Sequence, residues 1–449
     1  MQIIKSKVVL LLTIFGLLYT VSVNAQVVDG SLGSYTPYSM FGLGDLATRG
    51  TAYHKGMGGI GIGIRNSKYI NVLNTASITQ RDTLSFMMDF GVENKNIYTA
   101  DSKTTSAYNT FGMHNFAMSF PIYKKSAFIV GITPVVDVGY RFQSKETDLE
   151  LINELGDVTY EKRGEGGVSK IFLGGAMVIA KYFSVGLEGS YYFGNQVRES
   201  NIMINPYLTE GKESVGYKTI NTGWRNKING FGAKASMQYS HPLAKNMHFT
   251  LGATYGFAAN LNSENTRYAY AISSNIVADT VAHVVSDSKI SLPMEIAAGF
   301  SLSKRDPLSK RDIWSLGFDY IRQDWSEVSF LEGTLGSDFS GDLMQSFRGG
   351  FEITPNMYDV RYYMKRVTYR VGAYHNKTYM NFGGTQINSI GVTAGMTLPV
   401  RQRSHTGISL SLDLGQRGTI SNNLLRERYA IFSVNLNLHD IWFQQFRYD

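Results

Sequence analysis

Apolar and polar residues alternate at every second position along most of the chain after residue 83. In the run from Phe249, apolar or aromatic residues at 249, 251, 253, 255, 257, 259 and 261 alternate with small or polar residues between them. Residues 389–398, 408–414 and 432–438 repeat the pattern. Because successive side chains of a β-strand point to opposite faces, the alternation predicts strands with one apolar and one polar face. About fourteen such segments occur, which predicts an all-β protein.

The connections between these segments alternate in length. Short turns occur at residues 121–126, 180–184, 241–247, 303–312 and 399–406, and longer polar connections at 143–168, 197–226, 262–289 and 326–344. A soluble β-sandwich also alternates, but short periplasmic turns opposite longer outer loops, with an even strand number, are typical of outer-membrane barrels. Residues 83–449 are therefore predicted to form a transmembrane antiparallel outer-membrane β-barrel of about 14 strands, with both termini in the periplasm.

The first 25 residues have the parts of a secretory signal peptide. Lys5 and Lys7 precede an apolar stretch from residue 8 to residue 23, and Val23-Asn24-Ala25 offers small residues for cleavage. The apolar stretch falls short of the roughly 20 residues that a membrane-spanning helix needs. Residues 1–25 are therefore predicted to be a cleaved signal peptide of a Gram-negative outer-membrane protein.

Residues 26–82 differ from the rest of the chain because glycines interrupt their apolar pattern. Candidate hatch residues are Gly56, Gly58, Gly59, Gly61 and Gly63. Repeated glycines disfavour a helix but allow close approach of backbone to surrounding walls. A barrel of about fourteen strands leaves a lumen to fill. We therefore expect residues 26–82 to be an N-terminal plug, or hatch, inside the lumen.

The glycine spacing also matches a GxGxxG phosphate loop, but this reading is disfavoured. Such a loop follows a strand and opens a helix. The segment around Gly56 has neither an amphipathic helix after it nor a predicted strand before it.

Composition narrows the function classes further. The chain has no cysteine, which excludes disulfides and thiolate metal sites, and its formal charge of +7 is spread over short turns rather than forming a basic stripe. Its eight histidines are scattered without metal-ligand spacing. We expect no enzyme activity, no cofactor, no metal and no nucleic-acid partner. Glu188 and Lys234 fall on the polar phase of their strands, so they are expected to line the lumen as solvated or paired groups.

Several motifs resemble the FadL-type outer-membrane transporters of long-chain fatty acids and aromatic hydrocarbons, in a Bacteroidota-like branch. Gly56-Met57-Gly58-Gly59, followed by Asn74-Thr75-Ala76, resembles the family's hatch and its Asn-Pro-Ala signature, with Thr75 in place of the proline. The barrel motifs that resemble the family are Leu292-Pro293, Gly299, Trp314, Asp319, Trp325-Ser326 and Arg370-Val371-Gly372-Ala373-Tyr374.

The resemblance implies a hydrophobic ligand site in the lumen and a lateral opening at a kinked third strand. Pro134 lies within the third predicted strand, residues 127–142, where a proline cannot donate to the ladder. It is the candidate lateral opening, although a position near a strand end above the membrane would also accommodate it.

The predicted function is passive uptake of hydrophobic compounds, such as long-chain fatty acids or similar lipids and aromatics, with lateral exit beside Pro134. Expected partners are a hydrophobic small molecule or lipid, outer-membrane lipids and possible envelope proteins. The alternative is a non-transporting barrel subunit of an outer-membrane protein secretion or assembly complex, since fold does not fix function. A general porin and an outer-membrane hydrolase are less favoured.

Overall fold

The computed structural model describes residues 26–27, 34–81, 85–101, 104–123, 125–205, 219–273, 276–307, 311–330, 338–400 and 406–441. The wall consists of β3 (Ser85–Ala100), β4 (Thr105–Pro121), β5 (Ser126–Lys145), β6 (Asp157–Ala180), β7 (Phe183–Asn205), β8 (Thr219–Ala244), β9 (Met247–Gly256), β10 (Ala259–Ser273), β11 (Ile276–Leu292), β12 (Glu295–Arg305), β13 (Asp312–Asp324), β15 (Leu343–Ile353), β16 (Thr368–Phe382), β17 (Thr385–Pro399), β18 (Gly407–Gly418) and β19 (Arg426–Ile441). The short elements are β1 (Gln26–Val27), β2 (Asp45–Leu46), β14 (Phe339–Gly341), α2 (Ala52–Lys55), α3 (Leu149–Leu155) and the 3₁₀ turns η1 (Pro37–Met40), η2 (Thr75–Thr79), η3 (Tyr363–Arg366) and η4 (Ser421–Asn423).

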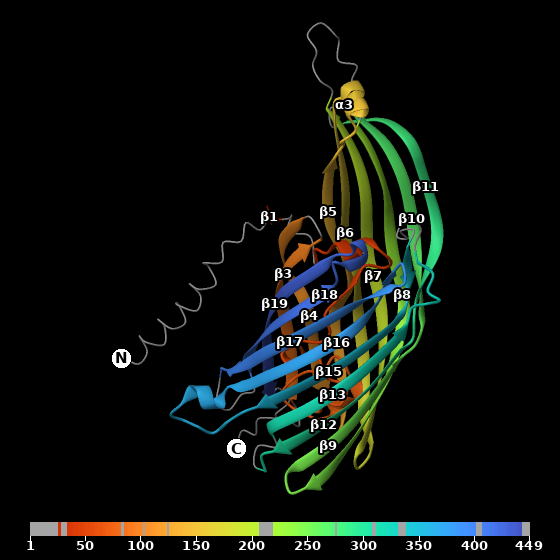
Figure 1. Cartoon of the computed structure of the whole chain (residues 1–449). Helices are drawn as coiled ribbons and strands as arrows, with labels where there is room; N and C mark the ends of the chain where they lie inside the picture. Colours follow the sequence, from red (N-terminus) through yellow and green to blue (C-terminus); the bar gives the residue numbers. More distant parts are fainter. Residues whose placement is uncertain are drawn as a thin grey trace, which may run out of the picture.

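The sheet closes into a barrel because β19 pairs with β3 along its whole length, from Arg426 opposite Ala100 to Ile441 opposite Ser85 (Figure 1). β9 with β10, and β11 with β12, are successive parts of single wall strands, so the barrel has fourteen strands. The antiparallel fourteen-stranded barrel predicted from the sequence is confirmed. None of the helices in the described residues is long and apolar enough to cross a membrane.

The two faces of the wall follow the alternation in the sequence. On β13, Ser315 and Asp319 point inward and are buried, whereas Leu316 and Phe318 point outward and are exposed. An apolar outer face and a polar inner face are the arrangement that a lipid-immersed barrel requires, since only the outer face meets hydrocarbon.

The raised part of the barrel wall consists of β5, β6, β7, β8, β10 and β11 (Figure 1). β6, β7 and β8 contain 24, 23 and 26 residues, whereas a tilted strand needs about 9–11 residues to cross a bilayer. Together with the upper half of β5, and with β10 and β11, their upper halves form what we call the tall sheet. The predicted long connections at 143–168, 197–226 and 262–289 are therefore wrong for most of their length. They are largely strand, and they lack clean apolar alternation because many of their buried positions are polar, such as Glu161, Asn226 and Ser263.

Residues 34–81, here called the inner segment, lie within the ring of strands. Their hydrogen-bond partners include Glu93 on β3, Glu188 on β7, Asp319 on β13 and Asn435 on β19. A segment that contacts strands on all sides of a closed wall, and is mostly buried, must occupy its interior.

The wall is interrupted between β4 and β5. Their pairing runs from Pro121 opposite Ala127 only to Phe116 opposite Ile132, although both strands continue well beyond these residues. Above this point β1 pairs with β4, and β2 pairs with β5. Short strands from the N-terminal part of the chain therefore pair with β4 and with β5 where these two strands separate.

Candidate functional site: the occupied lumen

The glycine-rich part of the inner segment is held by one wall carboxylate. Asp319 Oδ2 accepts the backbone N–H groups of Gly61 at 2.6 Å and Ile62 at 2.8 Å, and its Oδ1 accepts that of Gly63 at 3.4 Å. Without a carboxylate, these buried donors would lack partners, which costs about 1–3 kcal/mol each. Asp319 is therefore a principal anchor between wall and inner segment.

A second anchor joins three neighbouring strands to the inner segment. Glu188 on β7 accepts Lys170 Nζ of β6 at 3.0 Å and Lys234 Nζ of β8 at 2.8 Å. Thr75 Oγ1, in the inner segment, donates to the same carboxylate at 3.0 Å. The prediction that Glu188 and Lys234 line the lumen is confirmed, and they are paired rather than free in solvent.

Further anchors lie around the rest of the ring. Lys55 of α2 contacts Glu93 on β3, and Arg49 donates two hydrogen bonds to Glu295 on β12, at 2.7 and 3.0 Å. On β18, Arg417 donates to Asp45 of the inner segment. Charged groups from widely separated strands thus fix the inner segment from several directions.

Arg370, a family-motif residue, packs its guanidinium against aromatic rings of the inner segment. Its Cζ lies 4.4 Å from the centroid of the Tyr53 ring and 5.1 Å from that of Tyr69. Its Nε donates to Glu352 at 3.1 Å. His54 lies beside this group on α2, outside the membrane-spanning strands, and burial together with Arg370 lowers the pKa of His54 to about 3. The imidazole is therefore neutral at pH 7.

Close backbone contact explains two of the glycines. Gly58 has φ +71°, a conformation that favours glycine, and its N–H donates to Thr393 Oγ1 at 2.8 Å. A Cβ atom at Gly372, on β16, would collide with the backbone of Gly58. The two motif glycines, far apart in sequence, thus meet at one contact between wall and inner segment.

A cavity of about 370 Å³ remains between the inner segment and the wall. Its lining is mixed: Phe172, Leu292 and Trp325 contribute apolar surface, whereas Lys170 and Arg348 contribute cations. Arg348 donates to Gly58 O, Ser346 Oγ and Asn376 Oδ1, so its hydrogen-bond partners are neutral groups. The volume falls in the usual range for a small-molecule site, and apolar surface exceeds polar surface in the lining.

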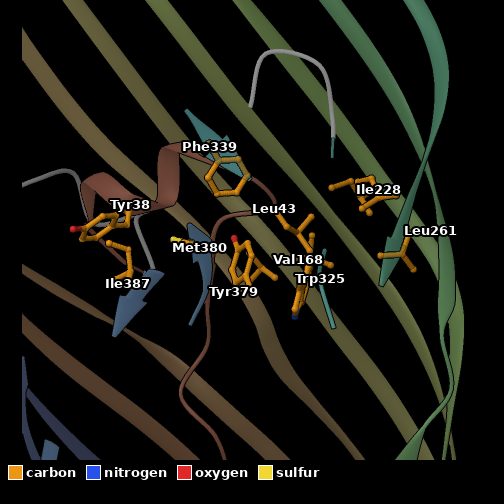
Figure 2. Packing of buried hydrophobic residues seen from close by; sticks show 12 residues of the cluster. Tyr38, Leu43, Val168, Ile228, Leu261, Trp325, Phe339, Tyr379, Met380 and Ile387 are labelled. Carbon is orange, nitrogen blue, oxygen red and sulfur yellow. The ribbon is translucent and has the colours of Figure 1, made fainter. Parts of the chain in front are cut away.

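An apolar layer crosses the lumen near the level from which the tall sheet rises (Figure 2). Tyr38 and Leu43 of the inner segment pack there with Trp325, Phe339 and Tyr379 from the wall. The Trp325 and Tyr379 rings stack with centroids 4.6 Å apart.

Pro134 lies in the middle of β5, where the register with β6 shifts between Pro134 and Val136. It is two residues beyond Ile132, where pairing with β4 ends, and it lines the cavity. Tyr35 of the inner segment closes the separation from within, because its ring stacks on Tyr108 of β4 and its hydroxyl accepts the N–H of Arg141 on β5.

The structure brings most of the predicted residues to the lumen. The inner segment carries Gly56, Gly58, Gly59, Gly61, Gly63, Asn74, Thr75 and Ala76, all buried, and the wall residues that contact it or line the cavity are Pro134, Pro293, Trp325, Arg370 and Gly372. Two of the predicted residues do not lie at the lumen. Trp314 shares the outward phase of β13, and Ser326 is exposed and donates to Asp324.

Asn74 orders the turn that follows it. Its side chain accepts the N–H of Ala76 at 3.0 Å, which caps η2, and its Nδ2 donates to Ile62 O at 2.8 Å. Thr75 and Ala76 then bond to Glu188 and Ser236 of the wall. Replacement of the family's proline by Thr75 therefore adds a hydroxyl donor to the Glu188 anchor.

Residues 1–25 lie outside the described residues, so the signal peptide stays a prediction. Sequence reasoning also missed Lys170, Arg49 and Glu295 as parts of the site. Each is a charged residue on a strand or segment expected to border the lumen, which was the available signal. Within the described residues no cluster of His, Asp and Glu side chains could hold a metal ion.

Comparisons with solved structures show the FadL-type barrel fold. The toluene transporter TbuX of Ralstonia pickettii matches with a TM-score of 0.54 and 12% identity, over 87% of this chain and 98% of that chain. A FadL homologue of Pseudomonas aeruginosa matches with a TM-score of 0.53 and 11% identity, over 90% and 100%. The CymD monoaromatic hydrocarbon channel matches with a TM-score of 0.52 and 15% identity, over 90% of this chain and 100% of that chain. These structures are channels and transporters rather than enzymes.

No curated protein matches the sequence. The family model described as BamG, in contrast, matches residues 3–449, almost the entire chain. Together with the barrel, this match supports an outer-membrane location. The chain belongs to the BamG family.

Proposed function

We propose that this protein is a non-transporting barrel subunit of an outer-membrane protein assembly complex. The observation that carries the proposal is that the inner segment fills the lumen and is bound to the wall at several points. Asp319, Glu188, Glu93 and Glu295, on four different parts of the wall, all bind the inner segment. We propose that residues 26–82 act as a permanent plug that stabilises the barrel. The tall sheet then offers partners a large surface on the side opposite the short turns. The match of almost the entire chain to the family model described as BamG supports this choice over a transporter.

Purification of the full chain from native outer membranes in mild detergent tests the proposal. We expect other envelope proteins to be recovered with it in fixed ratio. Depletion of the protein should lower the amount of other folded outer-membrane barrels, measured by their heat-modifiable electrophoretic mobility. Recovery of the chain alone, with unchanged barrel content after depletion, would contradict the proposal.

Passive uptake of hydrophobic compounds is the second candidate, and one observation favours it. The cavity of about 370 Å³ reaches Pro134, close to the point at which β4 and β5 stop pairing. A long-chain or aromatic molecule could enter this cavity and leave sideways into the bilayer if the inner segment moved. This candidate places the ligand site in the lumen and the exit beside Pro134, and it would make residues 26–82 a movable hatch.

A disulfide between wall and inner segment separates the two candidates. The N–H of Ala76 donates to Ser236 Oγ at 3.0 Å, so cysteines at these two positions lie within reach of each other, and the chain has no other cysteine. Ala76→Cys/Ser236→Cys should retain assembly function when oxidised if the plug is permanent. Uptake of a labelled long-chain fatty acid by proteoliposomes that stops on oxidation and returns on reduction would instead support the hatch. The two single variants are the matched controls.

A further inference from the structure

The lumen-facing side of the tall sheet carries a row of side chains above the apolar layer. Arg198 of β7 lies on this side, because its Nη2 donates to Gly42 O of the inner segment at 3.3 Å. Residues directly opposite each other in antiparallel strands lie on the same face of the sheet. The registers therefore extend the row of Arg198 from β5 to β11, and its members are Tyr140, Gly164, Arg198, Trp224, Arg267 and Val284.

A second row follows two residues further along each strand, toward the raised end of the tall sheet. Its members are Phe142, Lys162, Ser200, Thr222, Ala269 and Ala282. We call the two rows together the upper rows. They contain three cations and no carboxylate. Asp279, which lies opposite Ala271, is on the same face one row further, on the edge strand β11.

The three cations, Lys162, Arg198 and Arg267, have no acidic partner within the described residues. Arg198 is 3% exposed and donates only to neutral oxygens, and its Nε has no acceptor. The guanidinium of Arg267 is exposed and lies 5.7 Å from the centroid of the Trp224 ring. Arg198 and Arg267 are two strand spacings apart, which is about 10 Å. Because a buried cation without a counter-charge is costly, an anion bound beside Arg198 would stabilise it.

The outward face of the same strands carries cations and carboxylates together. Its residues alternate in sequence with those of the upper rows. Arg141 donates to Glu161 at 2.5 Å, and Arg163 donates to Glu165 at 2.6 Å. Charge of a single sign is therefore a property of the lumen-facing side at this height.

The position of the upper rows restricts what can bind to them. The tall sheet rises beyond the strands of the opposite wall (Figure 1). Lys162, Arg267 and Val284 are exposed, so the rows meet solvent. Lipid packs against the outward face of a barrel wall, so the sheet itself separates the upper rows from lipid phosphates. The ligand is therefore a molecule that approaches from above the inner segment.

The spacing of the cations favours an extended polypeptide. One small anion cannot contact two cations about 10 Å apart, whereas side chains on one face of an extended chain recur about every 7 Å. Two carboxylates on such a segment can therefore reach different cations. Trp224 and the 57% exposed Val284 lie in the row of Arg267 and offer apolar surface to the side chains between them.

We propose that the upper rows bind an acidic, extended segment of another envelope protein. Its carboxylates pair with Arg267 and Lys162, and its apolar side chains pack against Trp224 and Val284. Arg198, buried in the same row, adds to the positive potential. This inference rests on the proposed function as an assembly subunit, and it identifies the surface that holds the partner and the chemistry of the partner.

Site-specific crosslinking in native outer membranes tests the surface, since the chain has no cysteine of its own. Val284 and Val285 are adjacent in sequence, lie on opposite faces of β11, and are 57% and 56% exposed. After labelling with a photoactivatable maleimide, Val284→Cys and Ala269→Cys should crosslink to one and the same envelope protein, at least tenfold more than Val285→Cys does. Equal crosslinking from position 285, or none from 284 and 269 although partners are recovered, would overturn this surface and leave the proposed function standing.

The mass of the product identifies the occupant. A product of twice the mass of the chain would show a second copy, and an adduct with lipid would show a lipid ligand. Either result would overturn the segment of a different protein.

Charge reversal tests the chemistry. Combined with Val284→Cys in the full chain, Arg267→Glu should reduce the crosslinking yield at least tenfold, and Arg267→Lys should keep it within threefold. The matched control is Lys289→Glu, because Lys289 is exposed on the outward face of β11 and its reversal should change the yield less than twofold. Heat-modifiable mobility checks that each barrel has folded. An undiminished yield with Arg267→Glu would overturn the acidic segment. If no envelope protein is recovered even with the unaltered chain, the proposed function itself fails.

Discussion

Replacement of Asp319 by Asn should release the glycine-rich part of the inner segment without unfolding the barrel. The carboxylate accepts three backbone N–H groups, two of them at 2.6 and 2.8 Å from Oδ2. The asparagine side chain at position 319 keeps one oxygen as acceptor for the N–H groups of Gly61 and Ile62. Each of these two hydrogen bonds is weaker by about 1 kcal/mol, because the acceptor no longer carries a charge. The NH₂ group of the asparagine then faces the N–H of Gly63, which loses its acceptor at a cost of about 1 kcal/mol. The expected loss is about 3 kcal/mol.

Amide hydrogen exchange measures this loss directly. In purified barrels in detergent, exchange at Gly61 and Ile62 should become roughly a hundredfold faster in Asp319→Asn, the equivalent of about 3 kcal/mol. Glu161→Gln is the matched control, because Glu161 on β6 accepts from Arg141 and Asn201 within the wall. Unchanged exchange in Asp319→Asn, or equal acceleration in the control, would refute the assignment of Asp319 as an anchor.

Three further predictions concern other groups that hold the inner segment in the barrel. Glu188→Gln removes the charged acceptor of Thr75 in the inner segment and leaves two partly buried wall lysines without a carboxylate, so it should cost about 2–3 kcal/mol, seen as protease cleavage of the inner segment at a lower temperature than in the parent; unaltered cleavage would contradict it. Gly372→Ala should abolish exchange protection at Gly58 while circular dichroism still reports the strands, and retained protection would show that the backbone contact can relax. Acidification from pH 7 to pH 5 should weaken retention of the inner segment by about 2 kcal/mol, because a released His54 with the ordinary pKa of about 6.5 takes up a proton that the buried one cannot. This stability is present above pH 6.5 and lost below it; His54→Gln, compared in the exchange assay at both pH values, should remove the difference.

The strands were predictable where the wall meets lipid and unpredictable where it does not. β9 and β17 alternate cleanly because one face packs against hydrocarbon and the other against the lumen. In the upper part of β8, by contrast, residues 219–227 read TINTGWRNK, and no apolar face remains to set a period of two. The hydrophobic pattern reports the burial of apolar residues, so strands whose buried positions are polar, such as Asn226 of β8, leave little trace in it.

The candidate site was predictable as a set of residues but not as a set of contacts. Glycine spacing and the polar phase of strands indicated which groups border the lumen, and Glu188 with Lys234 followed from this reasoning. The three N–H groups on Asp319 did not, because they depend on how the inner segment folds against a strand more than 250 residues away. Contacts of this kind are set by three-dimensional packing that no local pattern encodes.

The strength of the anchors is the physical ground for choosing between a plug and a hatch. Release of the inner segment would break the Asp319 contact, about 3 kcal/mol, and the Thr75 hydrogen bond to Glu188, about 2 kcal/mol, besides the ion pairs of Lys55 and Arg49, so the total is on the order of 10 kcal/mol. A passive transporter must recover that free energy from its ligand in every cycle, since no other source acts on the barrel. Ligands with dissociation constants between 1 mM and 1 μM supply roughly 4–8 kcal/mol, and much of that would be needed to displace water and charge from the mixed lining of the cavity. This comparison of free energies favours an inner segment that stays in the lumen, with partners binding to the exposed surfaces of the barrel.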